Sequence, residues 1–266
     1  MSTYLAVRCV ILASCAAGLL AGGAAAQQVR VVRYADSEPF RMGAMTSRRI
    51  VHPDMGAKNT TLNLSISTAG AEFAQHQHDR SDDTILVLEG QVNLRQGESL
   101  RPFKAGEFAF IPAGQTHGTI TTGAGETVMI SFQNPPDIAL YTGARDPGKA
   151  GPPAALGKIT PGAVKYMNFR GKDGRFSGPG NGSMHVTASH WRLVRNKVMR
   201  ARAQAGGELL LFVWKGGIRV SDGRQTYVAG ERDTIFVQGK ADLEMTGNAD
   251  GAIEIIQVEA PGGAGR

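Results

Sequence analysis

Three of the six histidines lie close together in the sequence and could bind a metal ion. His76 and His78 are separated by one residue, and His117 follows them. On a β-strand, side chains two residues apart point to the same face, so this pair would present two imidazoles together. A third imidazole and a carboxylate from neighbouring strands would complete a nitrogen and oxygen site for a divalent transition metal. Asp82 and Asp83 can each supply the carboxylate.

Short apolar runs predict the strands that must position these side chains. The runs are bounded by Gly, Asn, Asp or Pro, and no segment after the first 26 residues has the pattern of a long amphipathic helix. The sequence therefore predicts an all-β fold of sandwich or barrel type. The predicted strand runs are 61–66, 84–88, 108–111, 127–130, 209–214, 218–220, 234–237 and 253–256.

The two halves of the chain repeat one another. The segment VLEGQV at 87–92 matches VWKGGI at 213–218, and the Ala-Gly-Glu turn at 105–107 recurs at 229–231. Such a repeat predicts two copies of one β unit. We expect a metal-binding barrel with N-terminal strands at residues 27–140 and a degenerate second barrel at residues 183–260. A Pro/Gly-rich linker at 141–182 would join them, and a disordered tail would follow at 261–266.

The spacing around the histidines resembles the two motifs of the cupin superfamily. The first motif runs from Gly70 through the pair His76 and His78 to Asp83 and Gly90, with gaps of five, four and six residues. Asp83 stands where the family has Glu. The second motif begins after 15 further residues and has Thr where the family has Asn. Its positions are Gly106, Pro112, Gly114, His117 and Thr121.

The resemblance implies tandem jelly-roll (cupin, RmlC-like) β-barrels with a metal ion inside the first one. Its ligands would be His76, His78, Asp83 and His117. The Asp83 side chain is one methylene shorter than the Glu of the family, so Asp82 or a water molecule is an alternative fourth ligand. The ion would be one divalent transition metal, and Mn, Fe, Ni, Cu and Zn all suit such ligands. In the second half, motif alignment sets Arg202, Gln204 and Asp242 at the histidine positions, so this barrel is expected to be metal-free.

The function implied is metal-dependent chemistry on a small oxygen-bearing organic compound, of the dioxygenase (oxidoreductase), lyase or isomerase type. A non-catalytic small-ligand-binding or sensing protein of the cell envelope is the alternative. Ile85 and Val87 point the same way as Asp83, which predicts an apolar pocket floor. The sequence identifies no catalytic acid or base outside the metal ligands and no cofactor other than the metal.

The first 26 residues predict export. They carry a single charge, Arg8, followed by an apolar stretch that ends in Ala24-Ala25-Ala26, as in a secretory signal peptide with a cleavage site. A lipidated Cys15 is the less favoured alternative. Cleavage would remove both cysteines, which excludes disulfides and thiol catalysis in the mature protein. The expected location is periplasmic or secreted, where an oxidising environment favours Mn, Ni, Cu or Zn over ferrous iron.

The composition limits the partners. The formal net charge is +6, but the densest basic run, at residues 192–202, alternates with apolar residues as a solvated strand does. An exported protein of this kind is not expected to bind nucleic acid, and no membrane span is expected in the mature form. The expected partner is a small-molecule ligand or substrate, and the sequence leaves a homo-oligomer open.

Overall fold

The structure is a computed structural model that describes residues 28–42, 45–138, 156–171 and 173–261. The predicted signal peptide and residues 262–266 of the predicted tail lie outside the described residues. Within these ranges no helix is long and apolar enough to cross a membrane. The elements bounded within the described residues are β-strands and the 3-10 turns η1 (Pro53–Met55) and η2 (Pro179–Asn181).

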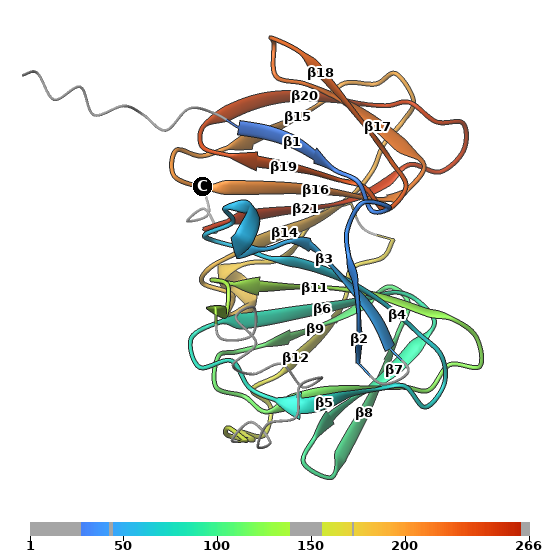
Figure 1. The fold of residues 1–266 in the computed structure, drawn as a ribbon, viewed down its shortest axis with the longest axis vertical. Helices are drawn as coiled ribbons and strands as arrows, with labels where there is room; N and C mark the ends of the chain where they lie inside the picture. Colours follow the sequence, from blue (N-terminus) through green and yellow to red (C-terminus); the bar gives the residue numbers. More distant parts are fainter. Residues whose placement is uncertain (1–27, 43–44, 139–155, 172, 262–266) are drawn as a thin grey trace, which may run out of the picture.

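The first barrel is built from two antiparallel sheets (Figure 1). Its strands are β2 (Pro39–Met42), β3 (Met45–Val51), β4 (Leu62–Ser67), β5 (Glu72–His76), β6 (Asp82–Glu89), β7 (Gln91–Gln96), β8 (Ser99–Lys104), β9 (Glu107–Ile111), β10 (His117–Thr121), β11 (Thr127–Asn134) and β12 (Lys165–Asn168). The larger sheet has the order β12-β9-β6-β11-β4-β3-β2, and the smaller has the order β5-β10-β7-β8.

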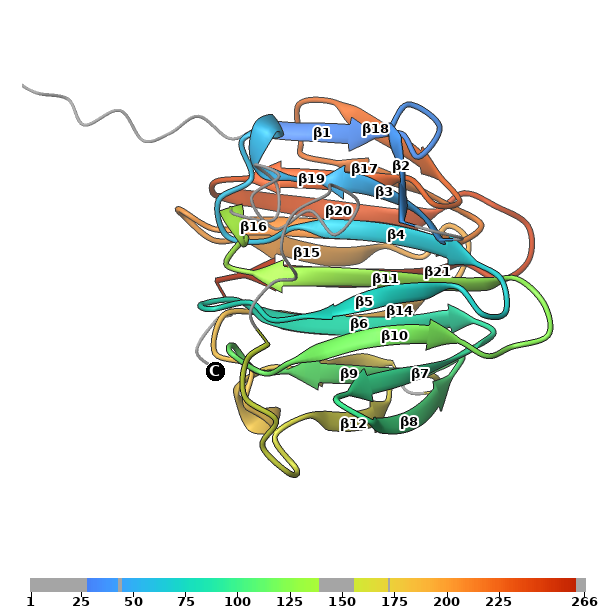
Figure 2. The same cartoon turned by 60° about the horizontal axis from the view of Figure 1, so that its bottom comes forward.

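The second barrel repeats this plan (Figure 2). Its strands are β1 (Gln28–Val32), β13 (Gly174–Ser177), β14 (Thr187–Arg192), β15 (Met199–Ala203), β16 (Glu208–Lys215), β17 (Gly217–Ser221), β18 (Thr226–Gly230), β19 (Thr234–Gln238), β20 (Ala241–Gly247) and β21 (Glu254–Ala260). The sheet orders are β1-β19-β16-β21-β14-β13 and β15-β20-β17-β18. All eight predicted strand runs overlap strands, and the tandem jelly-roll fold is confirmed.

Three apolar cores hold the molecule together. One fills the first barrel and another fills the second. The third lies between the barrels, where Leu86 and Phe132 of the first pack with Phe212, Trp214 and Phe236 of the second. Successive residues of a strand point to opposite faces, so β6 and β16 each serve two cores and are buried along almost their whole length. Trp214 of β16 is 3% exposed in this shared core.

The repeated turns explain two of the matching glycines. Gly90 ends the β6–β7 turn at φ 78°, and Gly216 ends the β16–β17 turn at φ 72°. Both values lie in the left-handed region that favours glycine. A Cβ atom on Gly90 would lie 2.9 Å from Cα of Thr127, and one on Gly216 would lie 2.8 Å from the carbonyl oxygen of Ala252. The repeat therefore preserves two turns that only glycine fits.

The order of the strands along the chain does not follow the division into barrels. β1 pairs with β19, so the first described strand belongs to the sheet of the second barrel although residues 27–140 were expected to serve the first. Part of the segment 141–182, expected as a linker, also forms strands: β12 extends the first barrel beside β9, and β13 extends the second beside β14. Strand patterning does not encode which sheet edge a strand will join, so this exchange of strands was not predictable from local patterns.

A buried carboxylate adds a polar contact between the barrels. Glu208 of β16 is 3% exposed and accepts hydrogen bonds from the backbone N–H groups of Lys58, Asn59 and Thr60, at 2.7, 2.9 and 3.1 Å. Gln238 of β19 donates to Glu208 as well and to the carbonyl of Gly56. A loop of the first barrel is thereby fixed to the second.

Candidate metal centre

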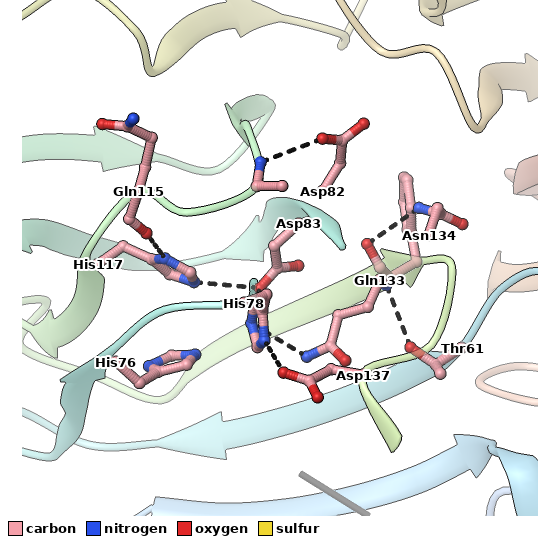
Figure 3. Close-up of polar contacts among 12 residues, drawn as sticks. Thr61, His76, His78, Asp82, Asp83, Gln115, His117, Gln133, Asn134 and Asp137 are labelled. Atoms are coloured by element: carbon pink, nitrogen blue, oxygen red, sulfur yellow. Dashed lines mark hydrogen bonds and ion pairs between the residues drawn. The ribbon is translucent and has the colours of Figure 1, made fainter. Parts of the chain in front are cut away.

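Four side chains that are distant in sequence meet in the first barrel (Figure 3). His76 is the last residue of β5, Asp83 the second residue of β6, and His117 the first residue of β10. His78 lies in the loop after β5, so the two paired histidines do not share one strand as the sequence predicted. One potential ligand atom from each residue lies within 4.8 Å of the others, which brings all four predicted ligands together.

A β-bulge turns His76 toward the other ligands. Along the β5–β10 ladder Phe73 lies opposite Thr119, but His76 lies opposite His117, so β5 contains one extra residue between the two pairs. A bulge of this kind shifts which face the following side chains occupy. His76 therefore shares a face with Phe73, three residues away, and their ring centroids are 4.8 Å apart.

Each imidazole is oriented by a contact on its Nδ1 atom. His76 Nδ1 lies 3.0 Å from the carbonyl oxygen of Ala74, and His117 Nδ1 lies 3.0 Å from that of Gln115. His78 Nδ1 lies 3.0 Å from Oδ2 of Asp137. A carbonyl or carboxylate oxygen accepts a hydrogen bond, so each Nδ1 must donate one. This arrangement leaves the three Nε2 atoms as the atoms available to a metal ion, in the pattern common at metal sites.

The charges of the site reinforce its geometry. Burial favours the neutral form of Asp83, but contacts from His117 and His78 at 3.4 and 3.6 Å outweigh it and hold the pKa of Asp83 well below its usual range. Burial also opposes a charge on His78, but its bonds to Asp137 and Asp83 raise the pKa of His78 to about 9. Burial and the two neighbouring imidazoles lower the pKa of His76. Asp83 is thus the anion of the site.

The structure distinguishes the two candidate carboxylates. Oδ2 of Asp83 faces the imidazoles, and its Oδ1 is buried with no hydrogen-bond partner in the described part of the chain. Asp82 turns away and accepts a hydrogen bond from the backbone N–H of Ala113 at 3.2 Å. Three imidazole nitrogens and a buried carboxylate suit a divalent transition metal, and the orphaned oxygen of Asp83 leaves room for a further bond.

Two further residues of the site were not found from the sequence. Asp137 bonds Nδ1 of His78, and the amide nitrogen of Gln133 lies 3.3 Å from its Nε2 atom (Figure 3). Gln133 is on β11, directly opposite Asp83. Neither residue belongs to a motif, and Asp137 follows a Pro-Pro pair in a stretch that reads as irregular. Period-two counting along β11 could have placed Gln133 on the inner face, but not beside His78.

The surroundings of the four side chains fit the remaining expectations. Ile85 and Val87 belong to the apolar core inside the first barrel, so the side chains next to Asp83 on this face of β6 are apolar. The three other histidines are not part of this group. His190, for example, is buried in the second barrel, where its Nε2 atom lies 2.9 Å from Oε2 of Glu254.

The described residues of the second barrel include no comparable centre. Arg202, Gln204 and Asp242, which motif alignment set at the histidine positions, are exposed on the outside of the barrel. Arg202 and Asp242 lie opposite each other and form an ion pair of 2.5 Å. Among the described residues, the group of His and acidic side chains that could hold a metal ion is the one in the first barrel.

Comparison with known proteins gives two sequence matches. A family model described as a cupin domain matches residues 64–132, a range that contains all four candidate ligands. The polyketide synthase CurC of Streptomyces cyaneus is 26% identical over 107 residues, which is 40% of this chain and 70% of that protein. Both findings agree with the resemblance in the motifs.

Solved structures match over most of the chain. The bacterial pirin YhhW of Escherichia coli, in complex with nickel(II), has a TM-score of 0.66 at 16% identity, covering 88% of this chain and 100% of that one. Oxalate decarboxylase of Bacillus subtilis, which has Mn(II) centres, has a TM-score of 0.65 at 12% identity, covering 89% and 78%. At such low identities the likeness concerns the fold alone.

Proposed function

Because this chain belongs to the cupin superfamily and has two barrels in tandem, we propose that it binds one divalent transition metal ion in the first barrel. His76, His78 and His117 would bind through Nε2, and Asp83 through its carboxylate. The observation that carries the proposal is the convergence of these four groups while each Nδ1 is engaged elsewhere. Nickel(II) and Mn(II) in the matched structures support the type of ion and leave its identity open.

We further propose that the protein is a metal-dependent enzyme of the dioxygenase, lyase or isomerase type. The metal would supply Lewis-acid chemistry at a carbonyl or enolate oxygen, or a site for O2. The chain's own residues position a small ligand: Ile85 and Val87 provide an apolar floor, and Asp137 fixes the ring of His78. The substrate that suits a charged, oxygen-binding centre above an apolar floor is a small organic compound with a coordinating oxygen.

The experiment that tests this function starts with the metal content. Protein purified from its native compartment should contain one equivalent of metal by elemental analysis. The metal-loaded protein is then screened against small oxygen-bearing compounds for turnover, with O2 uptake recorded in parallel. Turnover with O2 consumption would establish a dioxygenase, and turnover without it a lyase or isomerase. Tight binding of a compound without turnover would favour the non-catalytic binding protein, and absence of metal would exclude both forms of the proposal.

Export is part of the proposal. It is supported by the apolar segment that ends in Ala24-Ala25-Ala26. The intact mass of the secreted protein should then correspond to a chain that begins at Gln27. A mass that corresponds to a lipidated N-terminus at Cys15 would instead favour the anchored alternative.

A further inference from the structure

Among the described residues, Gln133 contacts the ligand nitrogen of His78, so its hydrogen bonding would change when a metal binds there. It is 3% exposed, and its Nε2 atom lies 3.3 Å from Nε2 of His78. Its Oε1 atom is buried and has no hydrogen-bond partner in the described part of the chain. Leaving such an amide unsatisfied is costly, so a partner in the site is expected.

The Nε2 atom of His78 offers a single bonding position in the plane of the ring. A metal ion bound at this position would replace the contact with Gln133, because Nε2 has only one in-plane bonding position. The amide nitrogen of Gln133 then needs another acceptor, while Oε1 still needs a donor. Asp137 holds the far side of the ring, so His78 cannot turn to restore the contact.

We infer that Gln133 orients the ligand of the metal centre and selects compounds that pair a coordinating oxygen with a neighbouring hydroxyl group. This inference rests on the proposed function. The amide N–H of Gln133 would donate to the coordinating oxygen, and Oε1 would accept from the hydroxyl. The ligand class that satisfies both ends of the amide is the small α-hydroxy carboxylates and α-hydroxy carbonyl compounds.

The test compares Gln133→Leu with Gln257→Leu. Gln257 is a matched control because it is a buried amide with an unpartnered Oε1 on β21, which occupies in the second barrel the place of β11 in the first. Each protein is loaded with Ni(II), its nickel content is measured, and glycolate and acetate are titrated against the Ni(II) absorption bands. Gln133→Met, which is closer to glutamine in length, replaces the leucine variant if that variant does not fold.

We expect wild type and both variants to hold one nickel, with nickel affinity in Gln133→Leu equal to or above that of wild type because no amide competes for His78. Glycolate affinity should fall roughly tenfold in Gln133→Leu and stay unchanged in Gln257→Leu, since one buried hydrogen-bonding group is lost. The preference for glycolate over acetate should also disappear in Gln133→Leu.

Three results would overturn the inference. Equal glycolate affinity in wild type and Gln133→Leu would show that the amide does not contact the ligand. Loss of nickel in Gln133→Leu alone would show that Gln133 supports the metal rather than the ligand. A wild-type protein that takes up no nickel, manganese, copper or zinc would overturn the proposed function itself, and the inference with it.

Discussion

The β5–β10 ladder of the first barrel and the β15–β20 ladder of the second are built on the same plan but differ by one residue. β5 contains a bulge between Phe73 and His76, whereas β15 and β20 pair without interruption. In the second barrel, the inward-facing pair at the end of this ladder is Ala203 opposite Ala241, both 2% exposed. In the first barrel the corresponding end of the ladder carries His76 opposite His117.

The other ligand positions follow the same division. Asp83 lies opposite Ile111 and Gln133, and in the second barrel Leu209 lies opposite Val237 and Glu259. Leu209 is fully buried among the apolar residues that fill the second barrel. The interior of the first barrel thus contains a polar centre, whereas apolar side chains fill the interior of the second. Both ladders therefore end in an inward-facing pair, and the residue type at these positions distinguishes the polar interior from the apolar one.

The largest effect is expected from removing imidazoles of the first barrel. The double variant His76→Ala/His78→Ala should lower metal affinity by far more than the roughly 100-fold that loss of an outer contact can cost, because two direct bonds are lost. Elemental analysis after dialysis measures the result. Gln204→Ala, at the aligned but exposed position of the second barrel, is the control and should keep one equivalent. Equal metal content in the double variant and wild type would exclude this site.

The stability of the metal-free protein should depend on pH through the buried histidine His78 of the first barrel. The pKa of His78 is raised from 6.5 to about 9, so its stabilising contribution is complete below pH 6.5 and is lost as the pH rises through 9. The free energy of unfolding should fall by about 3 kcal/mol over this interval. Urea unfolding at the two pH values measures it.

His78→Gln is the control for this measurement, since it removes the titrating group and should flatten the profile. An unchanged slope in that variant would assign the pH dependence to another group. Metal binding replaces the proton on His78, so metal affinity should rise with pH over the same interval.

The next largest effect on stability is expected from the contact that Glu208 makes between the two barrels. Glu208→Ala leaves three buried or partly buried N–H groups of residues 58–60 without their acceptor and should destabilise the protein by about 3 kcal/mol. Thermal unfolding monitored separately for each barrel would show whether both lose stability together. Glu231→Ala, a change of an exposed acid in the same barrel, should have little effect. Independent melting of the two barrels in wild type would contradict the shared core.

Some residues of the candidate site were predictable from the sequence and others were not. The four candidate ligands and the strand runs were predictable because ligand spacing and period-two patterning are local properties. Asp137 and Gln133 were not, since their contacts with His78 depend on how the end of β11 returns to the loop after β5.

Motif alignment set Arg202 and Asp242 one residue away from the structural equivalents of His76 and His117. These equivalents are Ala203 and Ala241. The connections from His76 to Asp83 and from Gly114 to His117 are each one residue longer than those of the second barrel. A shift of one residue reverses the face that a strand side chain occupies.

Substitution of Asp137 tests how strongly the orientation of the His78 imidazole affects metal affinity. Asp137→Ala removes the acceptor on Nδ1 of His78 and should weaken metal binding by about 10- to 100-fold, as loss of such outer contacts does. Asp137→Asn keeps an acceptor oxygen and should lose less. Competition of each variant against a chelator of known affinity provides the measurement. Equal losses in Asp137→Asn and Asp137→Ala would mean that the negative charge, rather than the hydrogen bond, sets the affinity.

The smallest effect is expected at the aligned pair of the second barrel. Arg202 and Asp242 have side chains 67% and 66% exposed, and exposed ion pairs contribute between about 0 and 1 kcal/mol because water and salt screen them. A double-mutant cycle of Arg202→Ala and Asp242→Ala, followed by chemical unfolding, should therefore give a coupling energy below about 1 kcal/mol that shrinks further in high salt. Metal content should be unchanged in all three variants, because both side chains lie outside the barrel. A coupling of several kcal/mol, or a change in metal content, would mean that these residues act on the interior after all, and the two ladders would then be functional equivalents rather than a polar and an apolar version of one design.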